Sequence, residues 1–543
     1  MIKTRLISLV ASILLGAAGC GGSSSEPPGP PPGPPPITGA EAFQFLNQAS
    51  FGATEADADL LISMNYEAWI GNQMRMAASL QLPHMLSLPP PQFMGQLHAD
   101  RVDIWFRNSL WGDDQLRQRV AFALSEIMVV SQLGALQSRP FVVADFYDVL
   151  ARNAFGNYRD LIEEVTLHPA MGVYLSMLGN RAPNPALNIR PDENYARELM
   201  QLFSIGLVEL NIDGTERLVD GQNVPTYDQA IIEGFAHVFT GWTWAFSPNF
   251  GSGRVPTISQ YTPMEHWPEF HDTGAKQLLN GVVLPAGQTG EQDLADALDN
   301  IFSHPNVGPF MAIRLIQRLT TSNPSPAYVR RVAEVFNDNG SGVRGDLGAV
   351  VRAILLDPEA RPANPMDMDG KLKEPLLRLT QLFRAYNATS ENGGYQLGGA
   401  YIIFGQGPQQ SPSVFNFFSP FFAPPGEIRD AGLVAPELEI ATEYLNTFFT
   451  NYMLFQTFGL NHTNMDLDPD DIYINFQEEM DVAADVDALI NRVDAKLLGG
   501  QMSNTLRTEI RGMVELVAET DPAVRAAEAI YLTVTSPEYA YQR

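Results

Sequence analysis

The residues that could do chemistry are concentrated between positions 192 and 276. Asn194, Arg197 and Glu198 are three and four positions apart, so a helix would bring them to one face. A carboxylate can act there as general acid or base while a guanidinium binds an anion. Glu198 and Arg197 are therefore candidate catalytic residues, and Asn194 is a candidate substrate-binding residue.

A histidine–aspartate pair, His271-Asp272, forms a second group. Such pairs ligate metals in some hydrolases, in which the other ligands come from separate helices. His237 is a candidate third ligand, and Glu233, four positions earlier, would share its helix face. The sequence therefore predicts a divalent-metal site of His237, His271 and Asp272, with His271 and Asp272 also as candidate catalytic residues. The zinc signature H-E-x-x-H is absent from the sequence.

Two further residues of the same region complete the candidate set as substrate-binding groups, Trp242 and Lys276. Trp242 belongs to a tryptophan-rich stretch that could provide an aromatic platform for sugars. The alternative is that these rings pack in the core or in a lid.

Both groups also have a purely structural interpretation. Asp272 could accept a hydrogen bond from the backbone ahead of Gly274 and so stabilise a turn. Arg197 could pair with Asp272 or Glu193 in a buried ion-pair network that ties helices together. Residue types and spacing leave both interpretations open.

The first twenty residues are typical of an export signal. Lys3 and Arg5 precede a short apolar run, residues 6–15, that is too short for a stable membrane span. Small residues then lead to Cys20, the only cysteine of the chain, so no disulfide within the chain can use it. We predict that residues 1–20 are a lipoprotein signal with lipidation at Cys20. The alternative is an ordinary cleaved signal.

This lipid would place the protein in a bacterial cell envelope. Gly21 after the cysteine favours sorting to the outer membrane, if the cell has one. Residues 21–37 are rich in Gly, Ser and Pro, a composition typical of an extended tether. Residues 38–543 are then predicted to form a single large domain, with a hairpin and loop insertion at about 207–290.

Apolar spacing along that domain predicts a mainly α fold, a large multi-helix domain with a small β-hairpin insertion and long loops. Residues 101–130 are predicted to be strongly helical, and residues 208–227 suit a short hairpin with turns at their Asp-Gly pairs. Four X-Pro pairs after apolar runs predict junctions at which one helix ends and another begins: His168-Pro169, His304-Pro305, Asp357-Pro358 and Ser536-Pro537.

The charge balance limits the classes of partner. The formal net charge is -28, whereas nucleic acids and anionic lipid surfaces are bound by clusters of Lys and Arg. We therefore expect no nucleic-acid partner. Membrane contact would come through the N-terminal lipid.

Seven segments of the chain, in order, resemble the bacterial family called domain of unknown function 1800. They cover nearly all of the chain after the tether: residues 45–52, 67–70, 116–125, 193–199, 240–242, 271–276 and 412–415. The resemblance implies a mostly helical, exported protein of a family that often occurs beside another secreted family related to sulfatases. It implies no reaction.

Two function hypotheses follow. The first is a surface binding or assembly component that acts with another exported protein through its loops. An exposed apolar or aromatic patch would support it, and residues 414–422 are the candidate. The second is an exported hydrolase, with a metal as candidate cofactor, whose site joins the helix of Asn194, Arg197 and Glu198 to His271-Asp272. That hypothesis needs those residues to converge in one pocket that solvent can reach.

Overall fold

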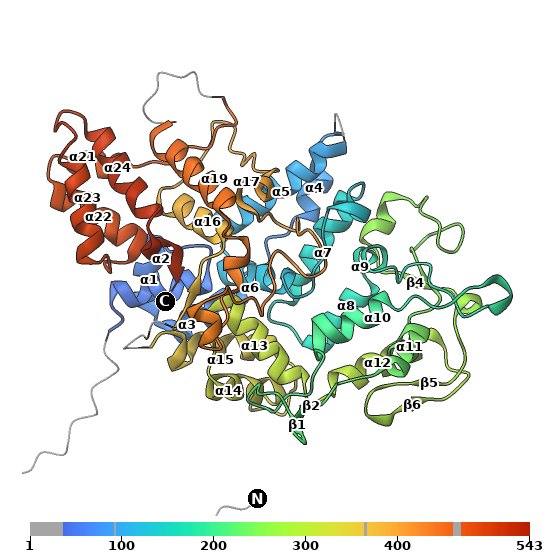
Figure 1. Cartoon of the computed structure of the whole chain (residues 1–543). Helices are drawn as coiled ribbons and strands as arrows, with labels where there is room; N and C mark the ends of the chain where they lie inside the picture. Colours follow the sequence, from blue (N-terminus) through green and yellow to red (C-terminus); the bar gives the residue numbers. More distant parts are fainter. Residues whose placement is uncertain (1–35, 92–93, 363–365, 367, 460–467, 543) are drawn as a thin grey trace, which may run out of the picture. The chain divides into compact units, whose positions relative to one another are not determined.

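Helices dominate the described part of the chain, which confirms the predicted mainly α fold (Figure 1). The computed structural model describes residues 36–91, 94–362, 366, 368–459 and 468–542, and residues 37–543 form one compact unit. Cys20, the signal sequence and nearly all of the tether lie outside the described residues. In the described ranges no helix combines the length and the apolar content that a bilayer span needs.

The N-terminal half of the compact unit consists of short and medium helices. They are α1 (Gly39–Ala49), α2 (Glu55–Met64), α3 (Tyr66–Arg75), α4 (Leu82–Ser87), α5 (Met94–Trp111), α6 (Gln115–Ser125), α7 (Pro140–Asn153), α8 (Tyr158–Leu167) and α9 (Pro169–Tyr174). Then follow α10 (Asn194–Glu198), the π-helix η3 (Leu199–Ser204) and α11 (Gln229–Val238).

The second half of the compact unit is also built from short and medium helices. Its helices are α12 (Gly290–Phe302), α13 (Val307–Leu319), α14 (Pro326–Asn337), α15 (Leu347–Leu356), α16 (Pro375–Ala385), α17 (Ala400–Phe404), α18 (Glu427–Asp430), α19 (Glu443–Leu454), α21 (Gln477–Val482), α22 (Val486–Leu498), α23 (Asn504–Val514), α24 (Pro522–Val534) and α25 (Pro537–Ala540).

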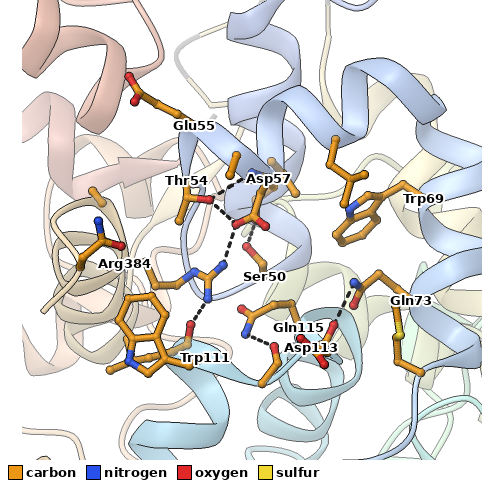
Figure 2. Close-up of a pocket in the computed structure, with 18 of the residues that line it drawn as sticks. Ser50, Thr54, Glu55, Asp57, Trp69, Gln73, Trp111, Asp113, Gln115 and Arg384 are labelled. Carbon is orange, nitrogen blue, oxygen red and sulfur yellow. Dashed lines mark hydrogen bonds and ion pairs between the residues drawn. The ribbon is translucent and has the colours of Figure 1, made fainter. Parts of the chain in front are cut away.

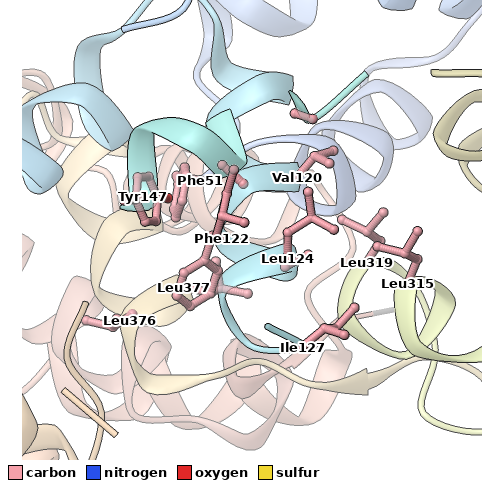
Figure 3. Packing of buried hydrophobic residues seen from close by; sticks show 14 of the residues in the cluster. Phe51, Val120, Phe122, Leu124, Ile127, Tyr147, Leu315, Leu319, Leu376 and Leu377 are labelled. Carbon is pink, nitrogen blue, oxygen red and sulfur yellow. The ribbon is translucent and has the colours of Figure 1, made fainter. Parts of the chain in front are cut away.

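Helix α6 lies at the centre of the core. All of its residues from Gln115 to Leu124 are buried, and it packs against α1, α3, α5, α7 and α13. Figure 3 shows its Val120, Phe122 and Leu124 among apolar side chains from distant parts of the sequence. The Leu315 and Leu319 side chains of α13 pack beside it, so the C-terminal end of α6 comes to lie against α13.

The predicted strongly helical stretch 101–130 is two helices, because the chain breaks between α5 and α6. A Cβ atom at Gly112 would approach the Asn108 carbonyl to 2.5 Å, so this turn requires glycine. The Asp114 carboxylate accepts hydrogen bonds from the backbone N–H and hydroxyl of Ser79, at 2.9 and 2.7 Å, which anchors the break to a neighbouring loop. The sequence signal was the Gly-Asp-Asp triplet, residues 112–114.

The four predicted X-Pro junctions are confirmed. His168 Nδ1 accepts from the Ala170 N–H at 3.0 Å, and the residues before the other three prolines accept hydrogen bonds from backbone N–H groups in the same way: His304, Asp357 and Ser536. A side-chain acceptor before a proline caps the first helical turn, where the missing N–H costs nothing. His168 is therefore the N-cap of α9, whereas His304 stabilises the turn that leads into α13, whose N-cap is Asn306.

Strands occur in the described residues only as four antiparallel pairs, each two residues long. The predicted hairpin is β1 (Leu218–Val219) with β2 (Gln222–Asn223), and both residues of its Asp220-Gly221 turn have positive φ, as a tight hairpin turn requires. The other pairs are β3 (Trp242–Thr243) with β4 (Glu265–His266), β5 (Lys276–Gln277) with β6 (Val283–Leu284), and β7 (Lys371–Leu372) with β8 (Tyr541–Gln542).

Candidate functional site

The His271 side chain is buried in a cluster with Asp293 and Lys276. Its Nε2 lies 2.9 Å from Asp293 Oδ2, and its Nδ1 lies 3.0 Å from the Thr240 carbonyl oxygen. Lys276 Nζ lies 2.6 Å from the same Asp293 oxygen and donates to the carbonyls of Asp272 and Gly274, at 2.6 and 2.9 Å. The three side chains are almost closed to solvent. Both ring nitrogens of His271 thus have partners within the protein.

The carboxylate of Asp272, the next residue, contacts a different histidine. His237 Nδ1, from α11, contacts its carboxylate, and the Gly274 N–H donates to Asp272 Oδ1 at 2.7 Å. The hydrogen bond from His237 lowers the pKa of Asp272 to about 2. Stabilisation of the turn by Asp272 is therefore confirmed.

The Arg197 guanidinium pairs with Glu193 at 2.9 Å, one of the two partners that the structural interpretation named. Glu193 also accepts a hydrogen bond from Gln229 of α11 at 2.9 Å, so the network joins α10 to the next helix. Arg197 is 40% exposed, which corrects the expectation that this network is buried. Asn194 is exposed. Glu198 is buried, which raises its pKa, and its Oε2 has no hydrogen-bond partner among the described residues.

Trp242 is buried in β3 and packs on His266 of β4, with ring centroids 5.1 Å apart. It cannot serve as an open platform for a sugar in this arrangement. His266 is also buried, and a Cβ atom at Gly290 would lie 2.0 Å from its Nε2. The tryptophan-rich region thus builds the core of the insertion.

The two histidines of the predicted metal site contact two different carboxylates. His271 is engaged by Asp293, and His237 by Asp272. Among the described residues, no group of three or more His, Cys, Asp or Glu side chains has an arrangement that could hold a metal ion.

A cavity of about 610 Å³ lies elsewhere, between η3, α13 and the segment 414–421. Its walls are mainly apolar, with Leu202, Ile205 and Phe310 among the lining residues. Phe415 and Phe421, which are 57% and 69% exposed, also line it. The aromatic patch expected at 414–422 is therefore present, and it borders a ligand-sized cavity.

Two of the charged groups of this cavity lie at the ends of two packed helices. Glu126 follows α6 directly, and Arg318 is on α13 beside it, with Glu126 Oε2 3.5 Å from Arg318 Nη1. The Gln406 amide donates to Glu126 Oε1 at 3.1 Å and to Glu374 Oε2 at 2.5 Å, so it bridges two buried carboxyl groups. Glu374 in turn pairs with Lys371 at 3.3 Å.

These two carboxyl groups have opposite pKa shifts. Burial raises the pKa of Glu126. Burial also acts on Glu374, but the charges of Lys371 and Arg318 outweigh it and lower that pKa. At neutral pH the pair therefore holds one proton, as expected for two acids that share one site.

Arg314 is the other cation of the cavity. Its guanidinium stacks on the rings of Phe310 and Phe421, at 5.2 and 4.5 Å from their centroids, and donates to Gln317. No ion pair joins it to a described carboxylate. Burial, together with the nearby charge of Arg318, lowers its pKa to about 9. The cavity thus combines apolar walls, an acid with a raised pKa and a guanidinium that an anion can reach.

Comparison with known proteins places the chain in one family. The family model described as "Protein of unknown function (DUF1800)" matches residues 44–541. The chain belongs to this family. No curated protein and no solved structure matches the chain.

The sequence reasoning missed Asp293, Glu126 and Arg314. A signal for Glu126 was available, because it lies within residues 116–130, most of which are apolar. A lone carboxylate in such a run needs a buried partner. Asp293 and Arg314 lie in amphipathic helices whose pattern gives no sign of a special role.

Proposed function

We propose that the protein is a lipid-anchored protein of the bacterial cell envelope that binds an amphipathic anion in the cavity beside Phe415. The ligand would have an apolar body and one carboxylate or similar head group. The observation that carries this proposal is the apolar cavity with the Arg314 guanidinium in its wall.

The apolar walls account for the body of the ligand. A cavity of about 610 Å³ is within the usual size range of small-molecule sites. An alkyl or aromatic body would displace water from Leu202, Ile205 and the faces of the phenylalanines, and each buried methylene contributes about 0.8 kcal/mol.

The local charge accounts for the head group. Arg314 and Arg318 line the cavity, burial raises the pKa of its buried carboxyl, Glu126, and its other carboxylate, Glu216, is exposed to solvent. A positive site in a chain of net charge -28 favours an anion over a cation. The planar guanidinium of Arg314 also suits a carboxylate geometrically.

Fluorescence of anilinonaphthalene sulfonate, itself an amphipathic anion, tests the proposal with the purified protein. Dodecanoate should displace the dye, and dodecanol should do so far less well. Arg314→Gln should weaken dodecanoate binding by about tenfold, because it removes a charge-assisted hydrogen bond. Arg254→Gln, at an exposed position away from the cavity, is the matched control. Equal binding of acid and alcohol, or no effect of Arg314→Gln, would refute the anion site.

The envelope location is the second part of the proposal, and its support is the sequence of residues 1–20. Labelling of cells with a fatty-acid analogue should mark the wild-type protein and leave Cys20→Ala unmarked. Fractionation should then find the variant outside the membrane fraction. A second exported protein as partner remains a prediction, and residues 414–422 are where it would be tested by cross-linking.

A hydrolase with its site at His271-Asp272 remains the alternative. Its support is limited to the buried Glu198, whose raised pKa is a property of many catalytic acids. Elemental analysis of the purified protein beside His271→Ala and His237→Ala is the test. Stoichiometric metal that both variants lose would favour the hydrolase over the binding protein.

A further inference from the structure

A second cavity, of about 510 Å³, lies on another part of the compact unit (Figure 2). It is lined by α2 and the turn before it, by α3, by the break between α5 and α6, by α16, and by Glu478 of α21 and Lys496 of α22. In contrast to the cavity beside Phe415, most of its lining residues are polar. We call it the polar cleft.

Two tryptophans belong to its wall. Figure 2 shows Trp111 and Trp69 on opposite sides of the polar residues Asp57, Gln115 and Arg384. Trp69 is buried, but Trp111 is 42% exposed, which is unusual for so large an apolar side chain.

The ring of Trp111 is held in place although it is exposed. Its Nε1 donates to the Tyr395 hydroxyl at 2.5 Å, and that hydroxyl donates to the Ala388 carbonyl at 2.8 Å. The Arg384 guanidinium lies 6.0 Å from the ring centroid. A fixed aromatic face in a cleft costs little entropy when a flat, partly apolar ring stacks on it.

The polar side chains of the cleft include acceptors that are not used up by the fold. Gln115 is buried and its Nε2 donates to two backbone carbonyls, but its Oε1 has no hydrogen-bond partner among the described residues. Asp113 is exposed, and its carboxylate is in no ion pair with a described residue. A buried acceptor without a donor is costly, so a ligand hydroxyl there would be favourable.

Other polar groups are fixed in orientation. Asp57 accepts from Arg384 Nη2 and from the Thr54 hydroxyl, each at 2.7 Å. The remaining capacity of such a carboxylate can accept from vicinal hydroxyls without a rotamer change. Four carboxylates line the cleft and only two cations do, and those cations already pair with Asp57 and Glu478.

We propose that the polar cleft binds a neutral saccharide. One sugar ring stacks on Trp111, and its hydroxyls donate to Gln115 Oε1 and to the Asp113 and Asp57 carboxylates. The excess of carboxylates disfavours acidic sugars. The saccharide site is independent of the anion site beside Phe415, so either proposal can fail without the other.

Calorimetric titration of the purified protein with chitohexaose, cellohexaose and maltohexaose tests the site. We expect millimolar or tighter binding of at least one of them. Trp111→Ala should weaken it by about tenfold or more, the usual effect of removing a stacking ring. Asp113→Asn, an exposed substitution that leaves the fold intact, should weaken the same sugar by a smaller factor.

Phe415→Ala, at the other cavity, is the matched control and should leave saccharide binding unchanged. Circular dichroism of Trp111→Ala against the wild type shows whether the variant is folded, and Asp113→Asn decides the question if it is not. The absence of heat with all three sugars would overturn the proposal. Binding that neither Trp111→Ala nor Asp113→Asn weakens would overturn it too.

Discussion

Two buried clusters of ionisable side chains, similar in composition, differ in what surrounds them. The insertion cluster consists of His271, Asp293 and Lys276, and the cavity cluster consists of Glu126, Glu374, Arg318 and Lys371. In the insertion cluster, His271 Nδ1 and Lys276 Nζ also have backbone carbonyls as partners, and solvent is excluded. The second opens through Glu126 and Arg318 onto a cavity.

This difference shows which property marks a functional site. The region from 192 to 276 is dense in His, Asp, Glu and Arg, yet His271, Asp272 and Arg197 each pair with a neighbouring side chain. In the cavity cluster a proton is held on a carboxyl group that borders a ligand-sized space. Access combined with a shifted pKa is the stronger criterion.

The largest expected effect comes from breaking the insertion cluster. Asp293→Ala would leave Lys276 as a buried cation without its carboxylate, which costs about 3–5 kcal/mol. Urea unfolding of the variant measures this cost. Asp299→Ala, on the same helix, removes an exposed partner of Arg159 and should cost less than about 1 kcal/mol. Equal costs for the two substitutions would contradict a structural role for the cluster.

The substitution Glu126→Gln in the cavity cluster should change how the stability of the protein depends on pH. Burial raises the pKa of Glu126 from 4.5 to about 8, so the folded protein binds a proton that the unfolded chain releases. The contribution of Glu126 to the free energy of unfolding is complete below its pKa in the unfolded chain. It is lost as pH rises toward its pKa in the folded protein. Relative to the wild type, the variant should therefore gain about 3 kcal/mol between about pH 5.5 and about pH 8.5.

Urea unfolding at the two pH values checks this prediction. Glu478→Gln, an exposed carboxylate in salt bridges with Arg492 and Lys496, is the control and should show no such gain. Parallel pH profiles of the wild type and Glu126→Gln would mean that Glu126 is ionised in the folded protein.

The fold was largely predictable because it follows local rules. Apolar spacing predicts the helices, and caps such as His168 and Ser536 are encoded within two or three residues of the helix that they start. The break at Gly112 was missed because apolar residues continue on both sides of the Gly-Asp-Asp triplet that signals it. The contact of Asp114 with Ser79 fixes the break in the fold.

The sites were less predictable because they depend on long-range packing. Glu126 meets Glu374 through Gln406, and Trp111 meets Tyr395, over separations of hundreds of residues. His271 has the spacing of a metal ligand, but its partner comes from α12, which carries no motif. A single sequence contains no direct signal for such pairs.

The third and smaller effect is on the pH dependence of anion binding, which tests the role of the cavity cluster. Above about pH 8 ionised Glu126 would place a negative charge beside Arg318, so dodecanoate affinity should fall several-fold. In Glu126→Gln the fall over the same range should be smaller, because only Arg314, whose pKa is about 9, then loses charge. Dye displacement at a series of pH values measures both proteins. A fall in affinity that is the same in the variant would assign the titration to another group.

The smallest effect is expected at the pair of His237 and Asp272, which lies at the edge of the insertion and is partly exposed. The hydrogen bond from His237 lowers the pKa of Asp272 below 3.8, so its contribution is present above that value and is lost as pH falls toward about 2. Because solvent reaches the pair, His237→Ala should cost less than about 1 kcal/mol at neutral pH.

Carboxyl NMR titration checks the cause directly. In His237→Ala the pKa of Asp272 should rise toward its ordinary value, held down only by the Gly274 N–H and the charge of Lys276. The Asp272 side chain would then still stabilise its turn. If His237→Ala instead costs as much as Asp293→Ala, the two histidines belong to one cooperative core. The exposed pair at the edge of the insertion and the buried cluster in its interior would then not differ in their contribution to stability.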